Sequence, residues 1–395
     1  MTISLNNVQI SSLLNLAQTA LIPQKEFFDI LEHIGVSGFL EMCFRNGVLA
    51  STKPAVSEMN FALMANMRHF VTSNFLFFTH SERKPPIVDI RNWKLNIVGD
   101  GVKNLLSISY DNLLKLPSVS YTRYLESAGN GRIFFDLLSG KKTRGYQWHF
   151  GGFGIAEWTG VRLAELLGMA GLKKSAVEIK MVGIDNSTLD IAMPLSKALE
   201  EDTILAYIMN GSILPVDHGF PLRAIVPGWI GAFNTKWVSK IIVSTQVSNN
   251  DEILTPVSHQ IMKSACCLPW PAKLRAGHQR ISGYAWSPYG RIAGVDISLD
   301  GGISFYPASL TGPNIERAGT RWEFCLDTEP GVLTITTRAT DTAGNTQYDV
   351  SKQQWNERGY LFGAMVPHPV TVAVDSGEVY GEDIEDYSTP GAGCC

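Results

Sequence analysis

Apolar residues near the N-terminus recur at the spacing of a helix. They follow one another at three- and four-residue intervals, as Phe27, Leu31 and Ile34 and then as Leu40, Cys43 and Phe44. This period places them on one helical face. Residues 13–21 are mildly apolar and are interpreted as an amphipathic helix rather than a signal peptide. The pattern predicts a helical extension over residues 1–69, built from short helices.

Residues 70–250 combine strand-like and helix-like patterns, which predicts a mixed α/β domain. Strands are expected where β-branched and apolar residues gather, at 93–98, 179–184 and 237–244. Helices are expected over 109–116 and 159–170. The apolar stripe of the second helix ends at Gly171. We expect Glu157 and Trp158 to begin that helix, with Trp158 in the core.

Residues 251–375 have a different pattern, with short alternating segments separated by Gly, Pro and Asp. Residues 294–299 run into an Asp-Gly-Gly turn at 300–302, which is a strong hairpin signal. Several strands at this spacing predict an immunoglobulin-like antiparallel β-sandwich. The expected fold class is therefore α+β, with the mixed α/β domain followed by the sandwich. Residues 376–395 hold acidic side chains and no basic one, so we expect a disordered tail.

Charge and hydropathy exclude several classes of partner. The 395 residues carry a formal net charge of −4, so no general basic field favours nucleic acid. No apolar run reaches the roughly 18 residues that a membrane-spanning helix needs. The N-terminal segment has neither a basic region nor a pair of arginines. We therefore expect a cytoplasmic protein that binds neither nucleic acid nor a membrane.

One segment carries more chemical information than the rest of the chain. Residues 124–132 read Tyr-Leu-Glu-Ser-Ala-Gly-Asn-Gly-Arg, and this run resembles the molybdenum-binding loop of the sulfite oxidase family, usually Leu-(Glu/Gln)-Cys-Ala-Gly-Asn. Other segments fit the family in order, at 157–161, 206–211, 217–223, 226–231, 235–237, 283–287, 295–302 and 341–345. On these motifs the chain is identified as a divergent member of the sulfite oxidase and sulfane dehydrogenase family over roughly residues 70–375.

The resemblance implies a Mo-molybdopterin cofactor and a set of residues that contact it. The matching positions in this chain are His218, Arg223 and Lys236, and these side chains supply the cations that a phosphate and a donor-rich ring need. Gly228 and Gly231 let the backbone come close to the cofactor. The resemblance also implies a homodimer formed through residues 260–375. Because the chain has no haem motif, a separate electron donor or acceptor is expected.

The first departure from the family is Ser127, which stands where the metal-ligating cysteine is expected. A thiolate is a soft ligand, whereas a serine hydroxyl is far less acidic and needs a high-valent metal to deprotonate it. Three interpretations remain open: Ser127 binds the metal as an alkoxide, the pterin dithiolene binds it alone, or the site holds no metal. An engineered cysteine-to-serine change would also explain the residue.

The second departure concerns the substrate pocket. Aligned on Phe77-Phe78, His80 takes the place of an arginine that helps to hold an oxyanion, and Glu82 takes the place of a histidine that contacts the pterin. A histidine lacks the permanent charge of a guanidinium, so free sulfite should bind weakly. Arg132 aligns with an arginine of the substrate pocket. His80 and His149 are candidate proton carriers, although His149 also fits a structural role.

A third departure is the missing tyrosine of the family's substrate pocket, which should follow the region of Ser244. The leading hypothesis is a molybdopterin-dependent oxidoreductase that performs oxygen-atom or two-electron transfer on a substrate other than free sulfite, with sulfur compounds as candidates. One alternative is a repurposed member that binds pterin without molybdenum redox chemistry. The other is a dimeric scaffold, because a shared fold does not guarantee a shared activity.

Overall fold

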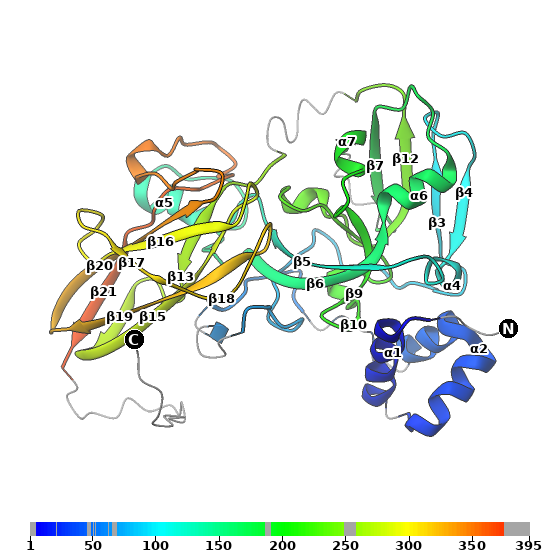
Figure 1. Cartoon of the computed structure of the whole chain (residues 1–395), viewed down its shortest axis with the longest axis horizontal. Coiled ribbons are helices and arrows are strands. Elements are labelled where there is room, and N and C mark those ends of the chain that lie inside the picture. Colours follow the sequence, from blue (N-terminus) through cyan, green and yellow to red (C-terminus); the bar gives the residue numbers. More distant parts are fainter. Residues whose placement is uncertain are drawn as a thin grey trace.

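The computed structural model describes residues 5–20, 22–45, 49, 51, 53–61, 63–64, 69–185, 191–248 and 258–374. Figure 1 shows three parts: two N-terminal helices, a mixed domain beside them, and a β-sandwich at the far side. The predicted tail over 376–395 lies outside the described residues. Among the helices of the described ranges, none is both long and apolar enough to cross a bilayer.

The N-terminal helices are α1 (Asn7–Thr19) and α2 (Gln24–Arg45), which confirms the helical interpretation of this region. A capping box between Asn6 and Gln9 begins α1. Helix α2 is kinked at Gly35, whose φ of 73° only glycine adopts readily. The kink breaks the apolar stripe, so Ile34 remains 36% exposed while Leu31 is buried. Both helices join the hydrophobic core of the mixed domain.

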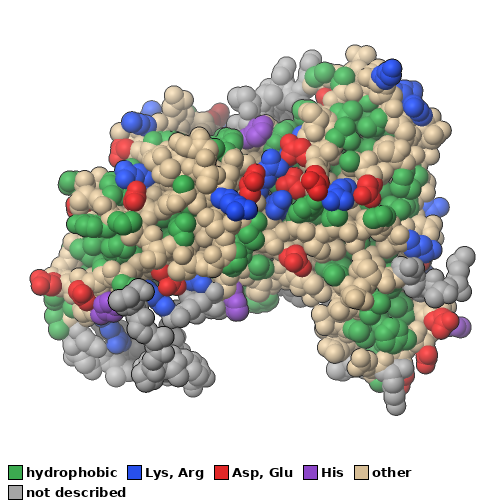
Figure 2. All heavy atoms as spheres, in the orientation of Figure 1, with side chains coloured by type: hydrophobic (Ala, Val, Ile, Leu, Met, Phe, Trp, Pro, Cys, Tyr) green, Lys and Arg blue, Asp and Glu red, His purple; other side chains and the backbone are tan. Residues whose placement is uncertain are grey.

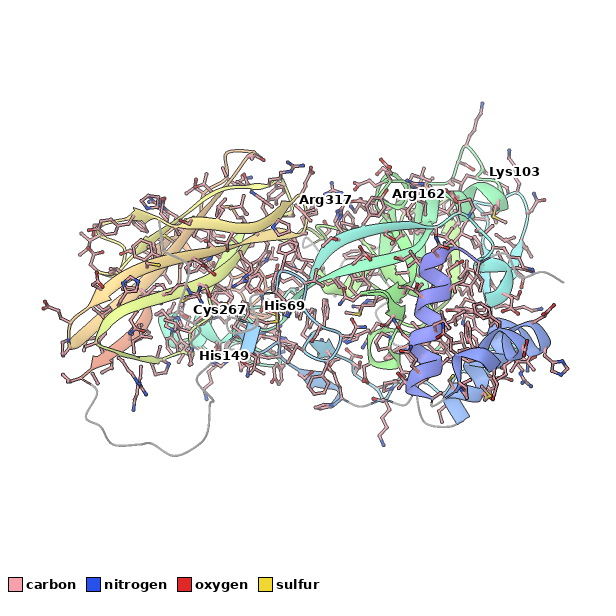
Figure 3. The ribbon with its side chains drawn as sticks, turned by 60° about the horizontal axis from the view of Figure 1, so that its bottom comes forward. His69, Lys103, His149, Arg162, Cys267 and Arg317 are labelled. Carbon is pink, nitrogen blue, oxygen red and sulfur yellow. The ribbon has the colours of Figure 1, made fainter. Side chains whose placement is uncertain are left out.

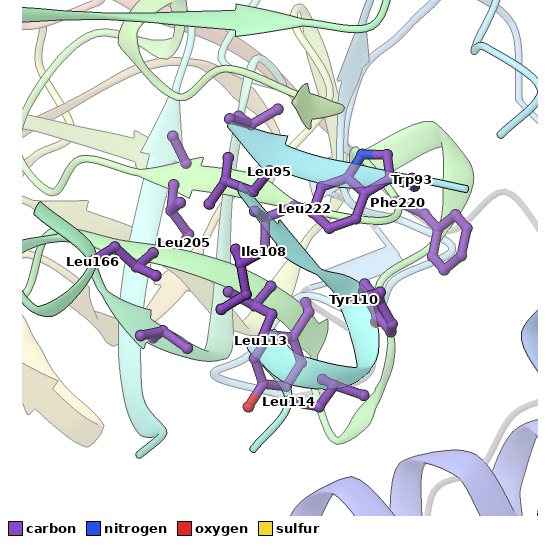
Figure 4. Packing of buried hydrophobic residues seen from close by; sticks show 14 of the residues in the cluster. Trp93, Leu95, Ile108, Tyr110, Leu113, Leu114, Leu166, Leu205, Phe220 and Leu222 are labelled. Atoms are coloured by element: carbon purple, nitrogen blue, oxygen red, sulfur yellow. The ribbon is translucent and has the colours of Figure 1, made fainter. Parts of the chain in front are cut away.

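The first sheet of the mixed domain has the strand order β4-β3-β12-β7-β8. Its strands are β3 (Lys94–Val98), β4 (Leu106–Ser109), β7 (Glu178–Gly183), β8 (Ala192–Pro194) and β12 (Val238–Ser244). The three strands predicted in this domain correspond to β3, β7 and β12. Helices α4 (Tyr110–Leu113), α6 (Leu163–Ala170) and α7 (Leu195–Ala198) accompany this sheet. Leu95, Ile108, Leu113, Leu166 and Leu205 pack in its core (Figure 4).

The second sheet reaches from the mixed domain towards the sandwich. Its order is β10-β9-β6-β5, with β11 paired to β9. The strands are β5 (Val119–Glu126), β6 (Phe153–Arg162), β9 (Ile204–Met209), β10 (Ser212–Ile213) and β11 (Arg223–Ile225). Helix α5 (Ile133–Ser139) follows β5, and the short strands β1 (Val56–Ser57) and β2 (Thr79–His80) form a separate pair. The loop between β5 and α5 carries Ser127.

One predicted element was wrong. Glu157 and Trp158 lie inside strand β6, and helix α6 begins only at Leu163. Strand β6 lies between β5 and β9, and hydrophobic clusters cover both of its faces, one with Phe153 and Ile155 and another with Ala156 and Trp158. It is therefore buried along almost its whole length, and its residues show no alternation that would identify a strand. The buried position of Trp158 was predicted correctly, and Gly171 does end α6.

The C-terminal domain consists of two packed sheets, which confirms the predicted fold class. One has the order β13-β15-β19-β18 and the other β14-β21-β20-β16-β17. The strands are β13 (Lys263–Cys266), β14 (Ala272–Arg275), β15 (Gly277–Trp286), β16 (Ile292–Ser298), β17 (Tyr306–Pro307), β18 (Ser309–Ile315), β19 (Gly319–Thr328), β20 (Gly331–Asp341) and β21 (His368–Ala373). Strands β16 and β17 pair antiparallel around the predicted Asp-Gly-Gly turn. Ile281, Ile297, Trp322 and Ile335 are among the buried core residues.

Ion pairs connect the two domains on the face shown in Figure 2, where acidic and basic side chains gather along the junction. Arg317 of the sandwich domain donates from Nη1 to Asp202 Oδ1 at 3.0 Å and to Glu200 Oε2 at 2.9 Å. Arg123 Nε donates to Asp202 Oδ2 at 3.0 Å. These side chains are partly exposed, so each pair contributes little to stability by itself.

Candidate functional site

A cavity of about 220 Å³ lies beside the loop that carries Ser127. Most of the predicted site residues line it: His80, Glu82, Ser127, Arg132, His218, Arg223, Gly231 and Lys236. Gly228 and His149 do not line it. These residues come from β2, the loop after β5, the 3₁₀ helices η1 (Val216–His218) and η2 (Gly231–Phe233), strand β11 and the segment before β12. Residues spread over more than 150 positions of sequence therefore face one cavity.

The Ser127 loop is a compact turn between β5 and α5. The backbone N–H of Ser127 donates to the carbonyl of Gly152 at 2.8 Å, and its own carbonyl accepts from the N–H of Asn130 at 3.0 Å. Its hydroxyl oxygen accepts from the N–H of Gly129 at 3.3 Å. Ser127 is half-buried at the cavity wall. The hydroxyl is thus fixed by the local turn and still faces the cavity.

Three cationic or potentially cationic side chains form one wall. Arg223 Nη1 donates to the carbonyl of His218 at 2.9 Å, and Lys236 Nζ donates to the carbonyl of Asp217 at 3.1 Å. Burial, followed by the charge of Arg223, lowers the pKa of Lys236 to about 7. Burial also lowers the pKa of Arg223 to about 9 and that of His218 well below 6.5. Desolvation destabilises the charged forms, and for Lys236 it outweighs the attraction of the carboxylates of Asp217 and Asp185.

The unsatisfied atoms of this wall fit a group that has both acceptor and donor atoms. His218 Nδ1 and Arg223 Nε are buried and have no hydrogen-bond partner among the described residues. Arg223 Nε is a donor, whereas His218 Nδ1 is an acceptor because Nε2 of the neutral ring donates to the carbonyl of Asn74 at 2.9 Å. Buried polar atoms normally have partners, and an orphan of this kind marks a place where another group is expected. The carboxylates that also line the cavity, Glu82, Asp185 and Asp217, make no hydrogen bond to these two atoms. A phosphate and the acceptor atoms of a pterin ring match the donors that this wall offers.

Arg132 occupies a tightly built position. Its Nε donates to the carbonyl of Arg358 at 2.8 Å and its Nη1 to the carbonyl of Tyr146 at 2.6 Å. A Cβ added at Gly129 would come within 2.2 Å of the guanidinium, so only glycine leaves room for it there. The guanidinium also lies over the ring of Tyr360 with a distance of 5.5 Å to the centroid. Two of its donors are therefore committed to the backbone.

His80 lies on β2, which is held in place by its pairing with Val56 of β1. The imidazole packs edge-on against Trp148 with the ring centroids 5.8 Å apart. Desolvation by the surrounding protein, then the charge of Lys236, lowers its pKa below 6.5 in spite of the opposing charge of Glu82. Because the side chain is also exposed to solvent, water screens part of this shift. His80 is accordingly neutral at pH 7.

His149 lies outside the cavity, near the junction of the two domains (Figure 3). Its backbone N–H donates to Glu58 Oε1 at 3.1 Å, and its Nδ1 lies 3.9 Å from the same oxygen. The nearby carboxylate of Glu58 raises the pKa of the imidazole, whose side chain is 46% exposed. Gly228 likewise faces Pro288 of the sandwich domain rather than the cavity. The roles proposed for both residues stay predictions.

The residues that line the cavity but were not identified from the sequence include Trp148, Asn234 and Tyr360. Asn234 is buried, and its Oδ1 accepts from the N–H of Val226 at 2.7 Å, so it shapes the wall between η2 and β12. Tyr360 comes from the sandwich domain and contributes an aromatic ring to the cavity. The tyrosine that was expected after the region of Ser244 is missing from this chain. No local pattern marks it, because its segment has neither helical nor strand periodicity.

Comparison with known proteins identifies both domains. Residues 82–252 match the model of the oxidoreductase molybdopterin binding domain, and residues 256–372 match the Mo-co oxidoreductase dimerisation domain. The mitochondrial sulfite oxidase of Mus musculus is 33% identical over 341 residues, which is 77% of this chain and 62% of that protein. The sulfite oxidase of Gallus gallus is 32% identical and covers 79% of this chain and 75% of its own length.

A solved structure agrees with these matches. The sulfane dehydrogenase SoxCD from Paracoccus pantotrophus superposes with a TM-score of 0.72 at 26% identity, covering 82% of this chain and 89% of its own. The chain spans about 62% of the length of the mouse relative that it matches. Both family models, the level of identity and the shared fold lead to one conclusion. The chain belongs to the sulfite oxidase family of molybdopterin oxidoreductases.

Proposed function

We propose that this protein is a Mo-molybdopterin enzyme that performs oxygen-atom or two-electron transfer on a substrate other than free sulfite. The observation that carries the proposal is the cavity beside Ser127, in which the buried donor Arg223 Nε and the buried acceptor His218 Nδ1 have no partner among the described residues. Such polar atoms are costly unless a bound group satisfies them. Membership of the family makes a pterin cofactor the natural candidate for that group.

Each side chain of the cavity wall has a distinct part in holding the cofactor. Arg223 and Lys236 would donate to the phosphate and to acceptor atoms of the ring. His218 Nδ1 would accept from an N–H of the ring, because its Nε2 donates to the carbonyl of Asn74. A Cβ at Gly231 would lie 3.1 Å from the carbonyl oxygen of Glu126, so glycine lets the backbone come close to the Ser127 loop. Ser127 would ligate the metal or lie next to it. When bound, the cofactor supplies the two-electron redox chemistry, while the protein supplies position and charge.

The substrate pocket has less permanent positive charge than a pocket with a second arginine would have. His80 is neutral at pH 7, and Arg132 has two donors committed to the backbone carbonyls of Tyr146 and Arg358. A small doubly charged anion gains little there. The ring of Tyr360 instead favours a substrate with apolar or polarisable surface. A sulfur compound larger than sulfite fits these features, and the structural relative is a sulfane dehydrogenase.

Proton transfer would fall to His80, since it lines the cavity and is neutral at pH 7, so that it can accept a proton. His149 is bound to Glu58 outside the cavity, which favours a structural role for it. The dimerisation domain supports a homodimer formed through residues 260–375, and a separate protein would donate or accept the electrons. We propose a cytoplasmic location for the protein.

One observation favours a second candidate function. The hydroxyl of Ser127 already accepts a hydrogen bond from Gly129, so the turn is satisfied without a metal. In that case the protein would bind pterin without molybdenum redox chemistry.

Two measurements on protein from a host that makes the cofactor separate the two candidate functions. They are elemental analysis for molybdenum and tungsten, and the fluorescence of oxidised pterin. Metal with pterin supports an oxidoreductase, and pterin alone supports the second candidate. The Ser127→Cys variant should then increase the metal-to-pterin ratio, because a thiolate is the softer ligand. An unchanged ratio in that variant would exclude position 127 as the metal ligand.

A further inference from the structure

A fully buried ion pair joins the two domains next to the Ser127 loop. The carboxylate of Glu126, which ends β5, lies 2.5 Å from the ammonium of Lys263, which begins β13, and both side chains are 0% exposed. The carboxylate also accepts hydrogen bonds from Asn130 Nδ2 and from Trp286 Nε1, each at 2.9 Å. The mixed domain contributes the carboxylate and the sandwich domain contributes the ammonium.

The same interdomain contacts fix the backbone on both sides of Ser127. Lys263 Nζ donates to the carbonyl oxygen of Asn130 at 3.1 Å. Gln260 Nε2 donates to the carbonyl oxygen of Glu126 at 2.7 Å. The serine thus lies between two carbonyl groups that side chains of the sandwich domain hold. We call Glu126, Asn130, Gln260 and Lys263 the loop clamp.

Stability alone does not explain a charged clamp. Removing two ions from water costs several kcal/mol each, and replacing a buried ion pair by apolar residues of similar volume is often neutral or stabilising. Apolar packing would also join the domains, and partly exposed ion pairs already do so at Arg317. The charged pair adds directional contacts, because its short hydrogen bonds hold donors and acceptors at defined positions. Those positions flank the residue at which the metal is expected.

We propose that Lys263 is a positioning residue, which acts through Glu126 and Asn130 to hold Ser127 in place at the cavity wall. The sandwich domain then has a second task besides dimerisation, since it completes the site of the other domain. The proposal rests on the proposed function in one respect only, namely that Ser127 binds or adjoins the metal. The immobilisation of the loop by Lys263 is a property of the chain itself and can be measured without any cofactor.

Hydrogen exchange of the loop amides tests the clamp. The N–H groups of residues 127 and 129–132 all donate hydrogen bonds within or next to the loop, so they report directly on its order. The test variant is Glu126→Gln/Lys263→Met, which removes both charges while nearly keeping both shapes. We expect exchange at 127–132 to become at least about tenfold faster, while exchange in β20 stays unchanged.

Two matched variants control the experiment. Arg317→Met removes an interdomain ion pair away from the loop, and exchange at 127–132 should stay as in the unaltered protein. Gln260→Leu removes only one arm of the clamp and should accelerate the same segment by a smaller factor. This variant also keeps the proposal testable if the double variant does not fold. Unchanged loop exchange in the variants that fold, or an equal rise in β20, would overturn the positioning role.

A second measurement separates this proposal from the proposed function. In cofactor-loaded protein, the double variant should lower the molybdenum-to-pterin ratio at least about tenfold while pterin is retained, because only the ligand position is released. If the unaltered protein holds pterin without metal, the proposed function fails, and the exchange data alone decide on the clamp. If it holds metal and the ratio does not change although the loop exchanges faster, Lys263 orders the loop without placing a ligand, and the positioning role is refuted.

Discussion

Lys236 should make anion binding to the cofactor-free cavity strongly dependent on pH. Its pKa is lowered from 10.5 to about 7, first by burial and then by the charge of Arg223. A bound anion favours the protonated form and raises the pKa again. The affinity of the cavity for the anion is therefore highest below pH 7 and falls as the pH rises through 7, because Lys236 in the free site must then take up a proton when the anion binds.

The size of the effect follows from the protonated fraction of Lys236. With a pKa of about 7, roughly nine-tenths of the side chain is charged at pH 6 and roughly one-tenth at pH 8, so affinity should fall about tenfold over this range. Lys53 has a pKa of about 8 and adds at most about a twofold loss by pH 8. Desolvation by burial lowers the pKa values of His218 and His80 from 6.5, which favours their neutral forms over this range.

Isothermal titration calorimetry of sulfate into cofactor-free protein measures this dependence, since sulfate keeps its two charges from pH 6 to pH 8. The Lys236→Arg variant is the matched control, because its charge is permanent and its affinity should vary at most about twofold. The Lys236→Met variant should bind weakly at both pH values. The reasoning would be refuted if the unaltered protein and Lys236→Arg showed the same pH dependence, or if sulfate did not bind at pH 6.

Two further predictions concern the substrate pocket. His80→Arg should strengthen sulfite binding at pH 7.5 about tenfold, because it adds a permanent charge, whereas His80→Gln should leave the affinity for sulfite unchanged. Calorimetry with sulfite measures both affinities, and equal values for the two variants would contradict the prediction. Gly129→Ala should displace Arg132, since the new Cβ would meet its guanidinium at 2.2 Å, and should raise the KM for an anionic substrate while pterin is retained. Gly168→Ala, where nothing lies within 4 Å, is the control, and an equal KM in both variants would refute the packing argument.

The difference between predicted and observed structure at residues 157–162 has a physical cause. The apolar residues from Val161 to Leu167 fit a helical stripe, yet β6 extends to Arg162 because β5 and β9 satisfy its backbone hydrogen bonds on both sides. A strand that is buried on both faces loses the alternation by which a sequence identifies it. The boundary between β6 and α6 therefore depends on neighbours that are distant in sequence.

The cavity shows a similar division. His80, Ser127, His218, Arg223 and Lys236 belong to motifs that are each continuous in sequence, so comparison of short segments finds them. Tyr360 and Lys263 belong to no such motif, and they reach the site only because the sandwich domain packs against the mixed domain. The two roles considered for His149 from the sequence, proton carrier or structural residue, stay predictions, and the folded chain places it against Glu58 outside the cavity.

The sequence by itself determined the family, the order of the two domains and the cationic side chains of the cavity, because periodicity and short motifs are local properties of the chain. Only the tertiary structure decided how those side chains are tuned and what supports Ser127. Burial lowers the pKa of Lys236. The ammonium of Lys263 pairs across the domain junction with Glu126, which is 137 positions away in sequence. Desolvation and long-range pairing depend on three-dimensional surroundings, which no local pattern of residues contains.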